Sequence, residues 1–185
     1  ESPPLISASG LASTNQYCYM DFSEGVFSSN SGEGGIELDD LEYTFESNGG
    51  NCTSVDVLEI KNYTGALLSG GETLIYAYVE LNSSPSGSET IMFAPADGSS
   101  IFDQGGNPMH PSSITGTMTF NASAEIDSLF LDPSNEYLDV IFSNGIYGDS
   151  QQLQTIQLND FQISINSNSG NAVSYTHLRA HETAY

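Results

Sequence analysis

Apolar and polar residues alternate along short runs of the chain, and glycine-, serine- and asparagine-rich segments separate these runs. Every second residue is apolar from Cys18 to Phe22 and again from Leu41 to Phe45. Successive side chains of a strand point to opposite faces, so this alternation is typical of strands with one buried face. Further alternating or apolar runs occupy residues 54–60, 72–81, 89–95 and 116–120. Since no run has a helical period, the pattern predicts an all-β fold with antiparallel sheets in a sandwich.

A second copy of the first part of this pattern starts at Asn135 and runs without a gap. Tyr17 and Tyr137 are 120 positions apart, as are Asn51 and Asn171. The apolar face of the first run is kept in both copies, through the pairs Cys18–Leu138, Met20–Val140 and Phe22–Phe142. The second run is kept in the same way, through the pairs Leu41–Phe161, Tyr43–Ile163 and Phe45–Ile165. A period of this length matches one sandwich domain and is too long for a solenoid unit.

Two short motifs lie at the ends of predicted strands, "FSEGVF" from Phe22 and "SIFDQGGNPM" from Ser100. They resemble the bacterial Ig-like repeats of long secreted and surface proteins, including the swimming-motility-associated repeat. The matching positions are Phe22, Ser23, Glu24 and Val26 in the first motif and Asp103, Gly106 and Asn107 in the second. The second copy has Asn144 where Glu24 stands in the first. The resemblance implies Ig-like sandwiches that act as spacers or adhesive stalks, with no catalytic residues.

The repeat and the resemblance together predict the domain organisation. We expect a bacterial Ig-like β-sandwich at residues 1–121 and a truncated second repeat at residues 122–171. After Asn171 the second copy should continue like "CTSVDVLEI", but the chain reads "AVSYTHLRAHET" without strand alternation. This string resembles the translation of a transposase sequencing adapter. We therefore interpret residues 172–185 as an adapter-derived, non-native tail, with a genuine basic tail as the alternative.

The charge of the chain limits its partners. Asp and Glu number 24 against 2 Lys and Arg, for a formal net charge of −22. Nucleic-acid binding needs cations that neutralise phosphates, so this class of function is excluded. No apolar run approaches the roughly 20 residues of a membrane-spanning helix, so we expect no membrane insertion. An extracellular or cell-surface location follows from the resemblance, with neighbouring Ig-like domains of the same chain as partners.

Candidate catalytic and redox residues are few. Without the tail, Lys61 is the one cation and His110 the one histidine of the sequence. His110 lies in "NPMHPSS", which predicts a surface turn, and no nucleophile-elbow or zinc-protease motif accompanies it, so we expect no enzyme. Cys18 and Cys52 leave two alternatives open: a disulfide across neighbouring strands, or two buried free thiols, which Leu138 at the position of Cys18 favours.

Calcium and glycans are the ligands that the sequence leaves open. The calcium candidates are Glu24, Asp103 and Asn107, followed by Asp39 and Asp40, because calcium prefers oxygen ligands. The spacing fits no EF-hand loop, and "DQGGN" is equally explained as a turn, so no cofactor is the main expectation. As an alternative function, an accessory module of a polysaccharide-active enzyme would bind cell-surface or matrix glycans through loop tyrosines. Tyr63 and Tyr147 are the candidates, although we expect both to be core or edge residues.

Overall fold

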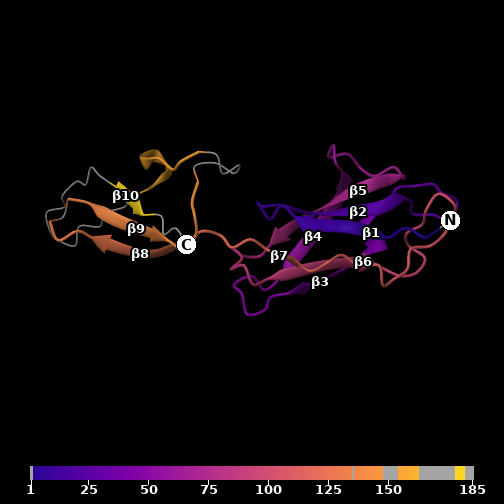
Figure 1. Ribbon diagram of the computed structural model, residues 1–185, viewed down its shortest axis with the longest axis horizontal. Coiled ribbons are helices and arrows are strands. Elements are labelled where there is room, and N and C mark those ends of the chain that lie inside the picture. The colour runs from indigo at the N-terminus through magenta and orange to yellow at the C-terminus, as the bar shows by residue number, and fades with distance from the viewer. Residues whose placement is uncertain (1, 135, 148–153, 163–177, 182–185) are drawn as a thin grey trace. The chain divides into compact units, whose positions relative to one another are not determined.

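The computed structural model describes residues 2–134, 136–147, 154–162 and 178–181 (Figure 1). The chain forms two compact units, Glu1–Ala122 and Ser123–Tyr185. Nearly all regular structure is strand, in antiparallel sheets with one exception in the second unit, so the predicted all-β fold is confirmed. Within the described residues no helix is long or apolar enough to cross a bilayer.

The first unit is a sandwich of two antiparallel sheets (Figure 1). One sheet has the strand order β1-β2-β5-β4, and the other has the order β3-β6-β7. The strands are β1 (Ile6–Leu11), β2 (Tyr17–Val26), β3 (Leu41–Glu46), β4 (Val55–Asn62), β5 (Glu72–Leu81), β6 (Thr90–Pro95) and β7 (Met118–Thr119). A short 3₁₀ turn, η1 (Leu38–Asp40), leads into β3.

The core lies between these two sheets and is built mostly from the alternating positions that the sequence predicts to face inward. Tyr43 is an exception, because it is 39% exposed on the short strand β3. On β2 the side chains of Cys18, Met20 and Phe22 are buried, while the residues between them are partly exposed. The facing sheet contributes the fully buried Phe93, and Phe120 follows β7. Burial of these large apolar side chains is the main contribution to the stability of the unit.

Strand β1 is the strand of the first unit that the sequence pattern did not predict. Its sequence, "ISASGL", is rich in small polar residues and has no clear alternation. The strand forms because β2 offers a complete hydrogen-bonding edge, to which β1 pairs in antiparallel register with an irregularity between Ile6 and Ala8. Tertiary pairing therefore overrides a weak local preference.

The second unit contains the hairpin of β8 (Ile126–Leu131) and β9 (Leu138–Phe142), followed by a 3₁₀ turn, η2 (Leu158–Asp160). β8 and η2 lie 120 positions after β1 and η1, and β9 corresponds at the same offset to Cys18–Phe22 of β2. The register is repeated as well, because Ile6 pairs with Phe22 and Ile126 with Phe142, with the irregularity at the same place. Phe142 also contacts Phe161, at 6.2 Å between ring centroids.

Hydrogen bonds at the ends of the two hairpins follow the same offset. The Ser23 hydroxyl accepts from the Leu5 amide at 3.0 Å, and the Ser143 hydroxyl accepts from the Glu125 amide at 3.0 Å. At the other end the Ala12 amide donates to the Tyr17 carbonyl at 2.9 Å, and the Asp132 amide donates to the Tyr137 carbonyl at 3.0 Å. The same backbone frame thus recurs in both units.

The last part of the chain differs from the expectation at one point. Leu178–His181 form a strand, β10, which pairs in parallel with β9, although the sequence of this stretch lacks the alternation of a half-buried strand. In the first unit β2 has an antiparallel partner, β5, on its second edge. The backbone of β10 pairs with β9 where an edge would otherwise carry unpaired amides and carbonyls. The predicted strand around Ile163 and Ile165 lies outside the described residues.

Candidate functional site

The two motifs that carry the family resemblance lie side by side in the first unit. Phe27 and Phe102 form an antiparallel bridge, in which each amide donates to the other residue's carbonyl at 2.9 Å. Glu24 lies near the end of β2, and Asp103 directly follows Phe102. The structure therefore brings the segments of these calcium candidates into one region.

The second motif forms a closed turn around Asp103. The carboxylate of Asp103 is fully buried and accepts from the Asn107 amide and from the Asn107 side-chain nitrogen, both at 2.8 Å. These hydrogen bonds, led by the one from the Asn107 side chain, lower the pKa of Asp103. Gly106 has φ of +81°, and a side chain there would collide with the Asn30 carbonyl. This geometry accounts for the predicted turn without a metal ion.

The second acidic pair has a structural explanation of its own. The Asp40 carboxylate accepts from the Glu37 amide at 2.8 Å and caps η1. The Asp160 carboxylate accepts from the Gln157 amide at 2.7 Å in η2, so the same cap recurs 120 positions later. Among the residues that the structure describes, no three His, Cys, Asp or Glu side chains are grouped to hold a metal ion.

We expect the thermal midpoint of the first unit to be the same in EDTA and in millimolar Ca²⁺. The hydrogen bonds from Asn107 already orient the carboxylate of Asp103, so the turn needs no ion to form. A ligand that binds the folded state at 100 times its dissociation constant would stabilise it by about 2.7 kcal/mol. Differential scanning calorimetry under both conditions checks this, and a calcium-dependent rise that Asp103→Asn removes would contradict it.

His110 is exposed in a turn, as the sequence predicts. Its Nδ1 lies 3.1 Å from the Ser112 amide and 2.6 Å from the Ser112 hydroxyl. Because the amide can only donate, Nδ1 acts as an acceptor for both groups. The contact is therefore local to the turn and stabilises its conformation.

Both cysteines are free and fully buried, which is the favoured one of the two alternatives. Cys18 belongs to the core of the sandwich, and burial raises its pKa to about 12. Cys52 lies in the loop before β4, where its Sγ is 3.0 Å from the Ser54 carbonyl and 3.1 Å from Asn82 Oδ1. The thiolate is the reactive form of cysteine, so Cys18 is suited to packing and not to redox chemistry. Cys52 is enclosed as completely, at 0% exposure.

We expect neither thiol to react with Ellman's reagent at pH 8 in the folded protein, because both are enclosed and Cys18 stays protonated. After unfolding in guanidinium, both should react. Absorbance at the thiolate product's wavelength measures this directly. A disulfide would instead leave the unfolded chain without reactive thiols until a reductant is added.

The outer face of the larger sheet carries a cluster of tyrosines that the sequence analysis did not identify as a site. We call the cluster the tyrosine face; it consists of Tyr17, Tyr19, Tyr76 and Tyr78. Tyr17 pairs across the strands with Tyr78, and Tyr19 pairs with Tyr76. The Tyr17 ring lies 4.9 Å from that of Tyr76 and 5.8 Å from that of Tyr78. The sequence signal was present, as tyrosine at every second position of two predicted strands.

A cation borders the tyrosine face. The Lys61 amine lies 5.6 Å from the centre of the Tyr78 ring and 2.7 Å from the Glu59 carboxylate. The face therefore combines aromatic rings, hydroxyls and a neutralised ion pair. Such a surface can contact apolar faces of a ligand and hydrogen-bond to its polar groups.

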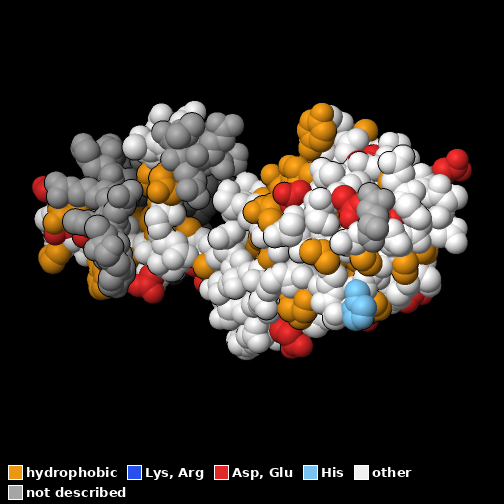
Figure 2. All heavy atoms as spheres, turned by 45° about the vertical axis from the view of Figure 1, so that its right-hand side comes forward, with side chains coloured by type: hydrophobic (Ala, Val, Ile, Leu, Met, Phe, Trp, Pro, Cys, Tyr) orange, Lys and Arg blue, Asp and Glu red, His pale blue; other side chains and the backbone are white. Residues whose placement is uncertain are grey.

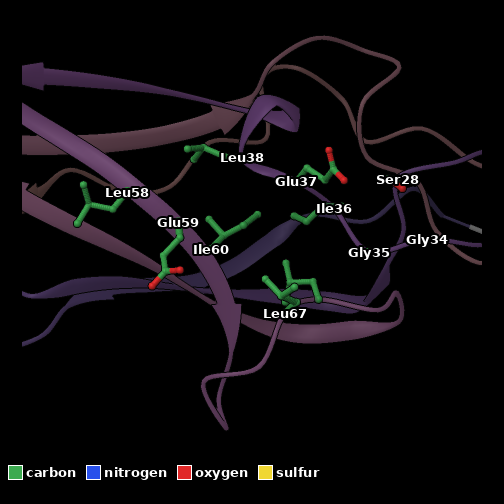
Figure 3. A pocket seen from close by; sticks show the side chains of 11 residues that line it. Ser28, Gly34, Gly35, Ile36, Glu37, Leu38, Leu58, Glu59, Ile60 and Leu67 are labelled. Carbon is green, nitrogen blue, oxygen red and sulfur yellow. The ribbon is translucent and has the colours of Figure 1, made fainter.

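Exposed apolar residues also gather at the far end of β4. Tyr63 is 74% exposed in the turn after the edge strand β4, and Leu67 is 77% exposed just beyond it, so of the two expected positions, core or edge, the core is excluded for Tyr63. Tyr147 in the second unit is 51% exposed, which likewise excludes a core position. A hollow of about 490 Å³ lies beside this turn (Figure 3). Figure 3 shows that Ile36, Ile60 and Leu67 converge on it from three segments of the chain.

Glu89 is an extensively hydrogen-bonded carboxylate to which no sequence motif pointed. Its side chain is fully buried just before β6 and accepts from the backbone amides of Ser86, Gly87 and Ser88 and from the amide of Cys52. Burial alone would raise its pKa, but these hydrogen bonds prevail and lower the pKa to about 2. The carboxylate joins the loop before β6 to the loop before β4, so its role is structural.

The remaining acidic side chains do not gather into one patch on the face of the first unit that Figure 2 shows. Figure 2 shows them distributed over the visible face of the first unit. Dispersed carboxylates keep the protein soluble and repel other anions, without defining a binding site. The tyrosine face is accordingly the best candidate site in the described structure. Comparisons of the chain with protein-family models, with curated proteins and with solved structures find no match.

Proposed function

We propose that the chain is part of a tandem array of Ig-like modules with a structural or adhesive, non-catalytic role outside the cell. The observation that carries this proposal is the recurrence of one hairpin, with its register and end hydrogen bonds, 120 positions later. Tandem copies of one frame form rods or stalks that hold other modules at a distance. Neighbouring modules of the same chain are then the main partners.

The strand order supports the Ig-like part of the proposal. In constant-type immunoglobulin domains the first, second, fifth and fourth strands form one sheet, and the third, sixth and seventh form the other. The orders β1-β2-β5-β4 and β3-β6-β7 are the same. The chain has no tryptophan, and Cys18 on β2 is a free thiol, so this sandwich is held by packing without the antibody-type disulfide.

The family resemblance supports the cell-surface setting. In the first motif, Phe22 packs in the core. In the second motif, Asp103 closes the turn that follows the Phe27–Phe102 bridge. The motif residues are thus accounted for by the stability of the module. This is the expectation for a spacer, whose one physical requirement is a stable and repeated fold.

Small-angle X-ray scattering tests the spacer role. We expect four copies of residues 1–121 joined in series to scatter as an extended rod, because each sandwich has its own core and need contact only its neighbours. The maximum dimension should grow in proportion to the number of copies. A maximum dimension that grows much more slowly, as for a compact assembly, would contradict the proposal.

Glycan binding is the second candidate function, and the tyrosine face favours it. Tyrosine rings offer flat apolar surfaces for the C–H groups of a sugar, and their hydroxyls can hydrogen-bond to it. The net charge of −22 disfavours acidic glycans and favours neutral or amino sugars. Tyr63 offers an alternative contact at the loop.

Affinity electrophoresis of the chain in gels containing neutral polysaccharides tests this second candidate. Tyr78→Ala should abolish any retardation if the tyrosine face binds, whereas Tyr63→Ala should abolish it if the loop binds. Tyr43→Ala is the matched control, since Tyr43 is 39% exposed on the other sheet. If no polysaccharide alters the migration of the chain, glycan binding is contradicted and only the spacer role remains.

A further inference from the structure

We propose that one cross-strand pair in each hairpin specifies strand partnership and prevents the tandem units from exchanging strands. The two pairs, here called the identity pairs, are Gly10–Tyr19 and Phe130–Asp139. They occupy the same register position, 120 residues apart. The inference rests on the repeated hairpin and holds whether the array is a spacer or binds glycans.

The repeated backbone frame creates the problem that the identity pairs solve. Strand exchange between similar neighbouring domains is a characteristic failure of repeat proteins. In this chain the end hydrogen bonds and the register of the hairpins do not distinguish β1 from β8, or β2 from β9. Discrimination must therefore come from the side chains that face each other across the strands.

In the first identity pair the Tyr19 ring occupies the place that a side chain at position 10 would take. A Cβ atom built at Gly10 would lie 2.5 Å from Cε1 of Tyr19 and 2.7 Å from its Cζ. Real Cβ atoms do not approach other atoms this closely, so the Tyr19 ring lies directly over the glycine. The ring covers a position that would otherwise expose backbone and weaken the strand.

The second identity pair places its ring on the opposite strand. Phe130 on β8 corresponds to Gly10, and Asp139 on β9 corresponds to Tyr19. The large residue thus belongs to the first strand of one hairpin and to the second strand of the other. Each hairpin combines one aromatic residue with one small or short residue.

Exchange would mismatch both pairings. If β8 replaced β1 on β2, Phe130 would meet Tyr19, and the Tyr19 ring would have to leave its place over the strand. If β1 replaced β8 on β9, Gly10 would face Asp139 and no ring would cover it. The first wrong pairing has two aromatic rings and the second has none, so each is less stable than the native pairs.

A double-mutant cycle in the full chain tests the pairing. Gly10→Phe and Tyr19→Asp should each lower the urea midpoint of the first unit. The decrease in the double variant should be clearly smaller than the sum of the two single decreases. Strictly additive losses would overturn the proposal. If Gly10→Phe does not fold, Gly10→Ala is used instead. It should lower the urea midpoint when Tyr19 is present and leave the midpoint unchanged when it is combined with Tyr19→Ala.

Refolding measures strand exchange itself. After dilution from urea, light scattering with size exclusion should find wild type and the double variant monomeric. Tyr19→Asp should be several-fold enriched in oligomers, because the shorter side chain on β2 then leaves room for Phe130 of another copy. Gly25→Ala is the matched control: its Cβ would lie 2.8 Å from the Gly71 carbonyl, so it destabilises the same unit with the identity pair intact. Equal oligomer fractions for Tyr19→Asp and this control would refute exchange through the identity pair.

Discussion

Replacement of Glu89 by glutamine is expected to lower the free energy of unfolding of the first unit by about 3 kcal/mol. The carboxylate is fully buried and accepts from four backbone amides and from the Ser86 hydroxyl. Glutamine has one acceptor oxygen, and its NH₂ group would face amide donors. At least one buried amide would then lack a partner, which costs the full desolvation of that group. Urea unfolding followed by circular dichroism measures the change.

The same variant should alter the response to acid. The folded-state pKa of Glu89, about 2, is lower than its ordinary value of 4.5, so the native state favours the carboxylate. Its contribution to stability is therefore complete above pH 4.5 and is lost as the pH falls toward 2. The difference between wild type and Glu89→Gln should accordingly shrink over this interval.

Glu46→Gln is the control for this prediction. Glu46 is exposed at the end of β3, so the same chemical change there should alter the free energy of unfolding by less than about 0.5 kcal/mol. A similar loss for both variants would mean that the general charge balance, and not the amide contacts of Glu89, determines the effect. A difference between wild type and Glu89→Gln that is constant from pH 5 to pH 2 would contradict the pKa argument.

Gly35→Ala is expected to lower the free energy of unfolding by about 2–3 kcal/mol. A Cβ atom at Gly35 would overlap the carbonyl oxygen and carbon of Leu68. Both are backbone atoms, so the clash cannot be relieved by rotating a side chain. The segment around Leu68 must move, and this segment also lines the hollow next to β4.

Gly116→Ala provides the matched control, because no atom lies within 4 Å of a Cβ atom there. This substitution should be neutral or slightly stabilising, since alanine restricts the unfolded chain more than glycine does. Thermal unfolding of both variants, with hydrogen exchange of the Leu67 and Leu68 amides, separates the two cases. Unchanged exchange and an unchanged midpoint for Gly35→Ala would show that this close approach is not needed.

The polar residues that the sequence suggests as calcium ligands or catalytic groups have structural roles in their own loops. Asp103 and Asn107 bond to each other, and Asp40 caps a 3₁₀ turn. His110 is confined to a local turn. In each case the polar side chain satisfies nearby backbone groups, which is the commonest role for such residues in loops.

The sequence alone was enough to predict the strands with one buried face, because their alternation depends only on neighbouring positions. It also determined the 120-residue repeat and the scarcity of cationic side chains, since these are properties of the chain as written. The inward positions of Cys18, Met20 and Phe22 followed directly from that alternation.

Features that depend on distant partners emerged only from the folded structure. β1 exists because β2 offers it an edge, and Glu89 is buried because two loops far apart in the sequence place their amides around it. The tyrosine face likewise needs β2 and β5 in one register. Local pattern fixes which side of a strand a residue occupies, whereas the neighbour across that strand is set by chain segments that only folding brings together.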